Sequence, residues 1–167
     1  SRMRKPEDQE FYDRELASFL PDRIFDAHCH LWQKQYVPWS FPDCPDEVGY
    51  DAYMTTMADV HGDRTAGALF IGYASPDNDA GRHSGNEWLG EQTAHDRNCR
   101  GLFFITPNDD PEWVRQEVRR LNLTGLKVYH VYSGITPTWN AQIPDYLPES
   151  FIEIAHEEGW VVMLHMV

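Results

Sequence analysis

The sequence predicts an α/β protein on a parallel sheet, namely about the first five strands of a (β/α)8 TIM barrel. Short apolar runs typical of buried strands alternate with amphipathic segments five times, at intervals of roughly 25 to 45 residues. Neither repeats nor low-complexity tracts interrupt this alternation. A complete barrel takes about 250 residues, so a chain of 167 residues corresponds to about five eighths of one.

The elements follow from the spacing of apolar residues and from glycine and proline stops. Residues 7–19 predict a helix that ends before Pro21, which divides the chain into an N-terminal lead-in over 1–22 and a partial barrel over 23–167. The expected strands span residues 23–30, 66–72, 101–105, 125–131 and 160–165. The expected helices span residues 50–60, 87–97, 111–121 and 151–158, with loops at 31–49 and 75–86.

Composition excludes several classes of function. The formal charge is −13, with 14 basic against 27 acidic residues, so an anionic backbone would be repelled and we expect no nucleic-acid partner. No apolar run approaches the roughly 20 residues of a membrane-spanning helix, so we expect no membrane partner. Three cysteines without paired spacing, and no apolar leader, favour a reducing compartment and a cytoplasmic location.

The most specific motif is Asp26-x-His28-x-His30 at the end of the first expected strand. Side chains two apart on a strand point to the same side, so the two imidazoles can meet one metal ion. Asp26 has the same parity, and we expect it to orient one of the histidines. His-x-His pairs also arise by chance as surface residues, but this one ends a buried strand and precedes a long irregular loop.

His165 ends the fifth expected strand, after the apolar run 161–164. A lone histidine there is more often a core residue than a ligand. In a parallel barrel, however, the C-terminal ends of all strands converge on one face, so His28, His30 and His165 would share a mouth. Three histidines suit a divalent metal, zinc above all, and leave a position for water.

Lys127 and Tyr129 lie on the fourth expected strand. A buried ammonium is costly unless it is paired or modified, so Lys127 either forms a salt bridge at the strand end or has a special role. His130 has the opposite parity from Lys127, so we expect it to face the helices. We assign Tyr129 and Trp32 to substrate binding, although aromatic residues in a long loop more often pin the loop.

Three segments of the chain resemble the amidohydrolase superfamily of metal-dependent hydrolases. "FDAHCHLW" resembles the His-x-His strand of that family, especially of its lactonase and decarboxylase branch. "VVMLH" resembles the segment of the fifth-strand histidine. "GLKVYH" is similar to the fourth-strand segment that carries a carboxylated lysine in ureases and dihydroorotases.

The resemblance implies His28, His30 and His165 as metal ligands and Lys127 as a bridging carbamate. The family also uses a sixth-strand histidine and an eighth-strand aspartate, which have no counterpart among these residues. We therefore expect hydrolysis of a small carboxylate, lactone or amide by a metal-activated water in a longer protein, and no turnover by the 167-residue chain alone.

Two alternatives stay open at this point. One is a non-oxidative decarboxylase on the same scaffold, and the other is a non-catalytic truncated or half-barrel subunit. An incomplete barrel exposes the edges of buried-type strands, so we expect the chain to form a homo-oligomer or to require the remainder of a barrel.

Overall fold

A computed structural model describes residues 5–36, 45–73 and 79–166. Its centre is a six-stranded sheet in the order β2-β1-β3-β4-β5-β6. The strands are β1 (Ile24–Gln33), β2 (Glu47–Val48), β3 (Thr65–Gly72), β4 (Arg100–Phe104), β5 (Gly125–Tyr129) and β6 (Val161–His165). β1, β3, β4, β5 and β6 pair in parallel, as the sequence predicts, while the short β2 pairs antiparallel with the end of β1.

The helices largely follow the expected pattern. The lead-in is α1 (Pro6–Phe11), which continues as a wider π-helical turn at Tyr12–Leu16. The other α-helices are α2 (Tyr50–His61), α3 (Asp79–Thr93), α4 (Pro111–Arg120), α5 (Ile143–Tyr146) and α6 (Glu149–Glu158). Short 3-10 turns cover Lys34–Tyr36, Gly62–Arg64, His130–Tyr132 and Thr138–Asn140.

Helix α3 begins eight residues before the predicted start at 87, inside the segment predicted to be a loop. The glycines and polar residues of this segment are poor helix formers, which is why the pattern indicated a loop. Tertiary contacts override that preference, because Arg82 and Asn86 lie one helical turn apart and both donate hydrogen bonds to the carbonyl of Phe104, at 3.3 and 2.9 Å.

Two apolar cores lie between the sheet and the helices. One joins β1 and β3 to α2 and α3, and it contains Leu31, Tyr53, Ala68, Phe70, Trp88, Leu89 and Cys99. The other joins β4, β5 and β6 to α4 and α6, and it includes Phe103, Val114, Val118, Leu126, Val128, Phe151 and Ala155. Alternate residues of each strand therefore face the helices, and the remaining residues face the opposite side of the sheet, called the inner face below.

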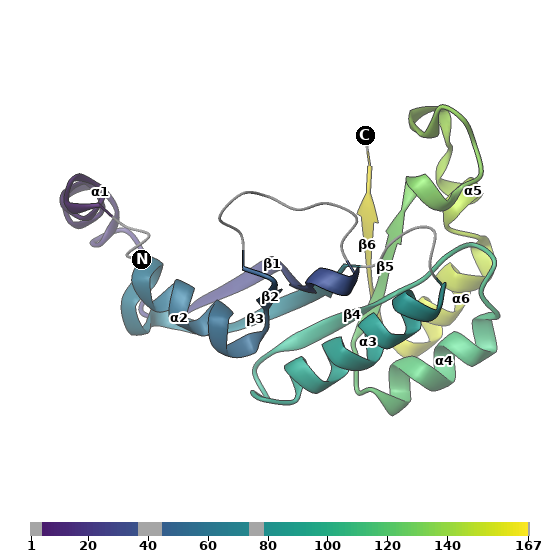
Figure 1. The fold of residues 1–167 in the computed structure, drawn as a ribbon, viewed down its shortest axis with the longest axis horizontal. Coiled ribbons are helices and arrows are strands. Elements are labelled where there is room, and N and C mark those ends of the chain that lie inside the picture. Colours follow the sequence, from purple (N-terminus) through teal and green to yellow (C-terminus); the bar gives the residue numbers. More distant parts are fainter. Residues whose placement is uncertain (1–4, 37–44, 74–78, 167) are drawn as a thin grey trace.

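The sheet is curled, with α2, α3, α4 and α6 following one another around its outer side (Figure 1). This arrangement is a half-barrel, consistent with part of a TIM-barrel-like fold. Among the described residues, no helix combines the length and apolar character needed to cross a membrane.

A buried ion pair fixes the C-terminal end of β4. The Arg82 guanidinium contacts the Asp109 carboxylate at 2.7 Å, with side-chain exposures of only 2% and 9%. Asp109 also accepts a hydrogen bond from the backbone N–H of Thr106 at 2.7 Å, and the Asn86 carbonyl oxygen accepts from the N–H of Phe104 at 2.8 Å. These bonds tie α3 to the edge of the sheet where the predicted site residues end their strands.

We predict that Asp109→Asn lowers the free energy of unfolding by about 3 kcal/mol, because it removes the negative charge that faces a buried guanidinium. Urea denaturation at pH 7 measures this loss. Glu112→Gln is the matched control, since it removes an exposed carboxylate from Arg115 and should cost at most about 1 kcal/mol. Equal losses in the two variants would contradict the structural role of the buried pair.

Candidate metal centre

His28 and His30 project together from the inner face of β1. Their neighbours Cys29 and Leu31 belong to the outer core, so alternation places both histidines on the other side. The Nε2 atoms of the two rings lie 3.3 Å apart.

This separation fits two ligands of one metal ion. Two zinc–nitrogen bonds of 2.0–2.1 Å that meet at a tetrahedral angle place their nitrogens about 3.3 Å apart. A hydrogen bond between one neutral imidazole and the other has a similar length, so the pair fits an ion without requiring one.

His30 is half-buried and its ring is held in place. The ring of Tyr73 stacks on it, with centroids 4.2 Å apart and planes 21° from parallel. Burial lowers the pKa of His30 to about 4, and the positive charges of His28, Lys127 and His165 act in the same direction. His30 is therefore neutral at pH 7, which is the form of histidine that binds metals. Its Nδ1 atom is buried, and the backbone of Ile71 lies near the ring and acts weakly in the opposite direction on the pKa.

Strand register relates His165 to this pair. The paired positions across the sheet are His30 with Ile71, Ile71 with Leu102, Phe103 with Leu126 and Gly125 with Val161. Followed from strand to strand, these pairings lead from His30 to Val161 on β6, which is four residues before His165. In a closed barrel with a shear of 8, the register shifts by about one residue per strand, and such a shift would bring His165 to the height of His30; that His165 shares the site stays a prediction.

His165 is exposed at the end of β6, and two rings contact it. The Tyr129 ring centroid lies 4.9 Å away and that of His130 lies 5.5 Å away. Partial desolvation of this ring lowers the pKa of His165, and the charges of Lys127, His130 and His28 lower it further. Within the described residues, no three His, Cys, Asp or Glu side chains are close enough to hold one ion. The structure thus brings together the two first-strand histidines, and a shared ion with His165 stays a prediction.

Lys127 faces the inner side of β5 and is only 1% exposed. Its ammonium nitrogen lies 4.9 Å from the centroid of the Tyr129 ring. Burial lowers the pKa of Lys127 to about 8. In the part of the chain that the structure describes, no carboxylate forms an ion pair with it, so the salt-bridge interpretation finds no partner there.

The two aromatic residues assigned to substrate binding lie in different surroundings. Tyr129 is on the inner face beside Lys127 and His165, and its hydroxyl oxygen is buried without a hydrogen-bond partner in the described residues. Trp32 instead donates from its indole N–H to the carbonyl of Pro45 at 3.2 Å, beside the pairing of Trp32 with Val48. These contacts tie Trp32 to the segment that leads into β2.

The expectation that Asp26 faces the same side of β1 as His28 and His30 is wrong, because β1 contains a bulge. Asp26 pairs with Ala68 and Cys29 pairs with Phe70, so three residues of β1 span two residues of β3. Asp26 therefore shares the helix side with Cys29, whose pKa is raised to about 12 by burial and by the Asp26 carboxylate. Asp26 accepts hydrogen bonds from the Tyr53 hydroxyl at 3.3 Å and from the His28 backbone N–H at 3.0 Å. It thus contacts the backbone of His28 and not its ring.

His130 is the residue that the sequence pattern missed. Parity placed it against the helices, but β5 ends at Tyr129 and a 3-10 turn begins at His130. The turn breaks the alternation and brings the His130 ring to His165. The sequence contains one sign of this turn, the segment "YHVYSG", in which the apolar run ends before Ser133 and Gly134.

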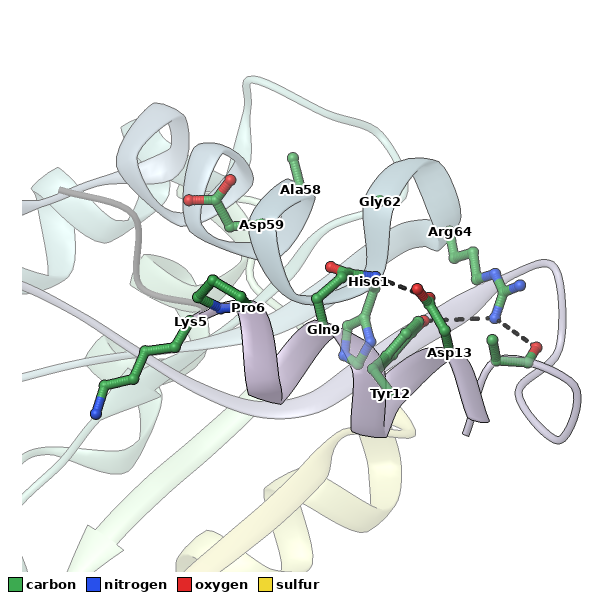
Figure 2. A pocket seen from close by; sticks show the side chains of 11 residues that line it. Lys5, Pro6, Gln9, Tyr12, Asp13, Ala58, Asp59, His61, Gly62 and Arg64 are labelled. Carbon is green, nitrogen blue, oxygen red and sulfur yellow. Dashed lines mark hydrogen bonds between the residues drawn. The ribbon is translucent and has the colours of Figure 1, made fainter. Parts of the chain in front are cut away.

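A separate cavity of about 860 Å³ lies between the lead-in helix and the end of α2 (Figure 2). Arg64 donates across it to the Tyr12 hydroxyl at 3.4 Å and to the carbonyl of Ala17 at 3.1 Å. The cavity is near the N-terminal end of β3, and none of the predicted site residues lines it. It is therefore not the predicted metal centre.

The fold of this chain is similar to that of a solved structure. No family model matches the chain, and no curated protein matches it. Among solved structures, a probable 2-pyrone-4,6-dicarboxylic acid hydrolase from Acinetobacter baumannii, with citric acid bound, superposes with a TM-score of 0.54 at 12% identity. The match covers 84% of this chain and 48% of that protein, so the chain spans about half of its length. At this identity the likeness shows the fold alone.

We predict that His30 titrates near pH 4 in the folded chain, below its ordinary value of 6.5. The neutral ring then contributes stability that is present above pH 6.5 and is lost as the pH falls from 6.5 toward 4, by about 1–3 kcal/mol. NMR titration of the imidazole and urea denaturation across this window measure both effects. His30→Gln should remove this part of the pH dependence, whereas His156→Gln, on the exposed face of α6, should keep it. A His30 midpoint near 6.5 would refute the expected burial.

We predict that Lys127→Met stabilises the chain by about 1–3 kcal/mol at pH 6, because it replaces a buried ammonium with an apolar side chain of similar length. The folded pKa near 8 lies below the ordinary 10.5, so wild-type stability rises with pH between these values and the advantage of the variant shrinks there. Urea denaturation in carbonate-free buffer tests this, with Lys34→Met as the exposed control. A less stable Lys127→Met variant at pH 6 would show that the ammonium is favourably bound.

Proposed function

We propose that this chain is the metal-binding portion of a metal-dependent hydrolase that acts on a small carboxylate, lactone or amide substrate. The observation that carries the proposal is the 3.3 Å approach of the two Nε2 atoms of His28 and His30 on the inner face of the half-barrel. Two facts support it: the resemblance of "FDAHCHLW" to a His-x-His metal strand, and the similar fold of a probable hydrolase.

The residues present fit a divalent ion, and imidazole donors favour zinc. His28 and His30 would hold it, with His165 as the third ligand from the far side of the half-barrel. When bound, the ion supplies a water of lowered pKa and polarises the substrate carbonyl. The chain's own part is to present neutral imidazoles, which the buried and ring-stacked position of His30 secures.

Lys127 has two roles open to it in this proposal: it forms a carbamate, or it stays an ammonium that binds the substrate. With a pKa near 8, part of the amine is neutral at physiological pH and can add carbon dioxide, which forms a carbamate and releases a proton. We favour the other role, in which the ammonium donates a hydrogen bond to a substrate carboxylate and the site holds one ion. Carbon-13 NMR in labelled bicarbonate distinguishes the two, since only the carbamate gives a new carbonyl signal.

Tyr129 completes the substrate side of the proposal. Its buried hydroxyl has no partner in the described residues, and it lies on the same face as Lys127 and His165. A substrate oxygen would satisfy this hydroxyl.

The outer edge of β6 has no partner strand in the described sheet, and pairing with a second copy or with further strands would cover it.

The metal is tested directly on this chain. We predict about one zinc ion per wild-type chain by elemental analysis after dialysis, and none in the variant that combines His28→Ala with His30→Ala. His95→Ala is the matched control, because His95 stacks on Tyr50 outside the site. A wild-type chain that retains no metal would overturn the proposed function.

The reaction is tested on a protein that contains this chain and completes the barrel. We predict metal-dependent hydrolysis of lactones, measured beside decarboxylation of aromatic acids under the same conditions. Removal of zinc with a chelator should abolish hydrolysis, and adding zinc should restore it. Decarboxylation without hydrolysis would replace the hydrolase assignment with the decarboxylase alternative.

A further inference from the structure

Two histidine rings from neighbouring strands stack at the C-terminal edge of the sheet. The centroids of His130 and His165 lie 5.5 Å apart, and the ring planes are 24° from parallel. His165 is a proposed metal ligand, whereas nothing in the sequence pattern assigns a role to His130.

The backbone explains why His130 reaches this position. β5 and β6 pair in register with Tyr129 opposite His165, so the residue after Tyr129 is the next one along this edge. The 3-10 turn that starts at His130 is closed by a hydrogen bond from the N–H of Ser133 to the carbonyl of His130, at 3.1 Å. The turn fixes the position of the His130 backbone beside the end of β6.

The two rings differ in how firmly they are held. His130 is only 9% exposed, while His165 is exposed near the end of the described chain. α5 packs against the turn that carries His130, whereas β6 has a partner strand on one side only in the described sheet. His130 is therefore the fixed member of the pair, and His165 is the member that needs support.

The two rings are also nearly parallel, so one imidazole packs along the face of the other. What His130 can supply is orientation of the neighbouring ring.

We propose that His130 is a positioning residue, which stacks on His165 and holds its imidazole in the orientation that binds a divalent metal on the inner face. This inference rests on the proposed function for the metal itself. A side chain that is already held loses less rotational freedom when it binds, so stacking raises the affinity of the site. Outer contacts that orient a ligand histidine typically change metal affinity by about 10–100-fold.

The experiment compares three variants of the 167-residue chain. His130→Leu keeps a buried apolar side chain but removes the ring, and His130→Phe keeps a planar ring. His83→Leu is the matched control, because it removes an imidazole that packs 4.8 Å from the Trp113 ring, between α3 and α4. Chelator competition measures the affinity of each variant for cobalt. The visible spectrum of bound cobalt reports the geometry of the site. NMR shifts of the His165 ring protons report stacking in the metal-free chain.

We expect His130→Leu to weaken cobalt binding by about tenfold or more, to change the cobalt spectrum and to abolish the ring-current shift of His165. His130→Phe should retain most of the affinity, and His83→Leu should match wild type. Wild-type affinity and spectrum in His130→Leu would overturn the positioning role while the proposed function stands. If the wild-type chain binds no cobalt, the proposed function fails, and the ring shifts alone decide whether His130 holds His165.

Discussion

Parallel pairing of neighbouring strands is the constraint on which the rest of this structure depends. Because β1, β3, β4, β5 and β6 run the same way, their C-terminal ends lie along one edge of the sheet. This pairing places His30 and His165 at the C-terminal ends of strands in one sheet, although about 135 residues separate them in the sequence. The buried pair of Arg82 and Asp109 fixes the middle of this edge by tying α3 to the end of β4.

The inner face disfavours positive charge on its own basic groups. Burial lowers the pKa of both His30 and Lys127, and the neighbouring basic groups lower that of His30 further. Neutral imidazoles are ready to bind a cation without first losing a proton. The same environment makes a buried lysine costly, and no carboxylate in the described residues offsets that cost. A site that sacrifices stability in this way is typical of function, where a ligand supplies the missing partner.

The sequence was sufficient wherever one local pattern decides the structure. The five parallel strands follow from their apolar runs, and the common side of His28 and His30 follows from strand alternation. Alternation fails where the pairing changes, which no single strand reveals. The bulge that turns Asp26 to the helix side appears only when β1 is counted against β3. In the same way, His130 reaches the inner edge because β5 ends two residues before the predicted end at 131, and α3 starts early because Arg82 bonds to β4.

X-ray absorption spectroscopy of the zinc-loaded chain tests the central claim most directly, because it reports the atoms around the ion without any assumption about the reaction. We predict at least two imidazole nitrogens at about 2.0–2.1 Å from zinc, with the multiple-scattering pattern of histidine rings and no sulfur. Substitution of His28 and His30 should remove that pattern. A first shell of oxygen alone, or one that contains sulfur from Cys29 or Cys99, would contradict the claim that these two histidines form a metal centre.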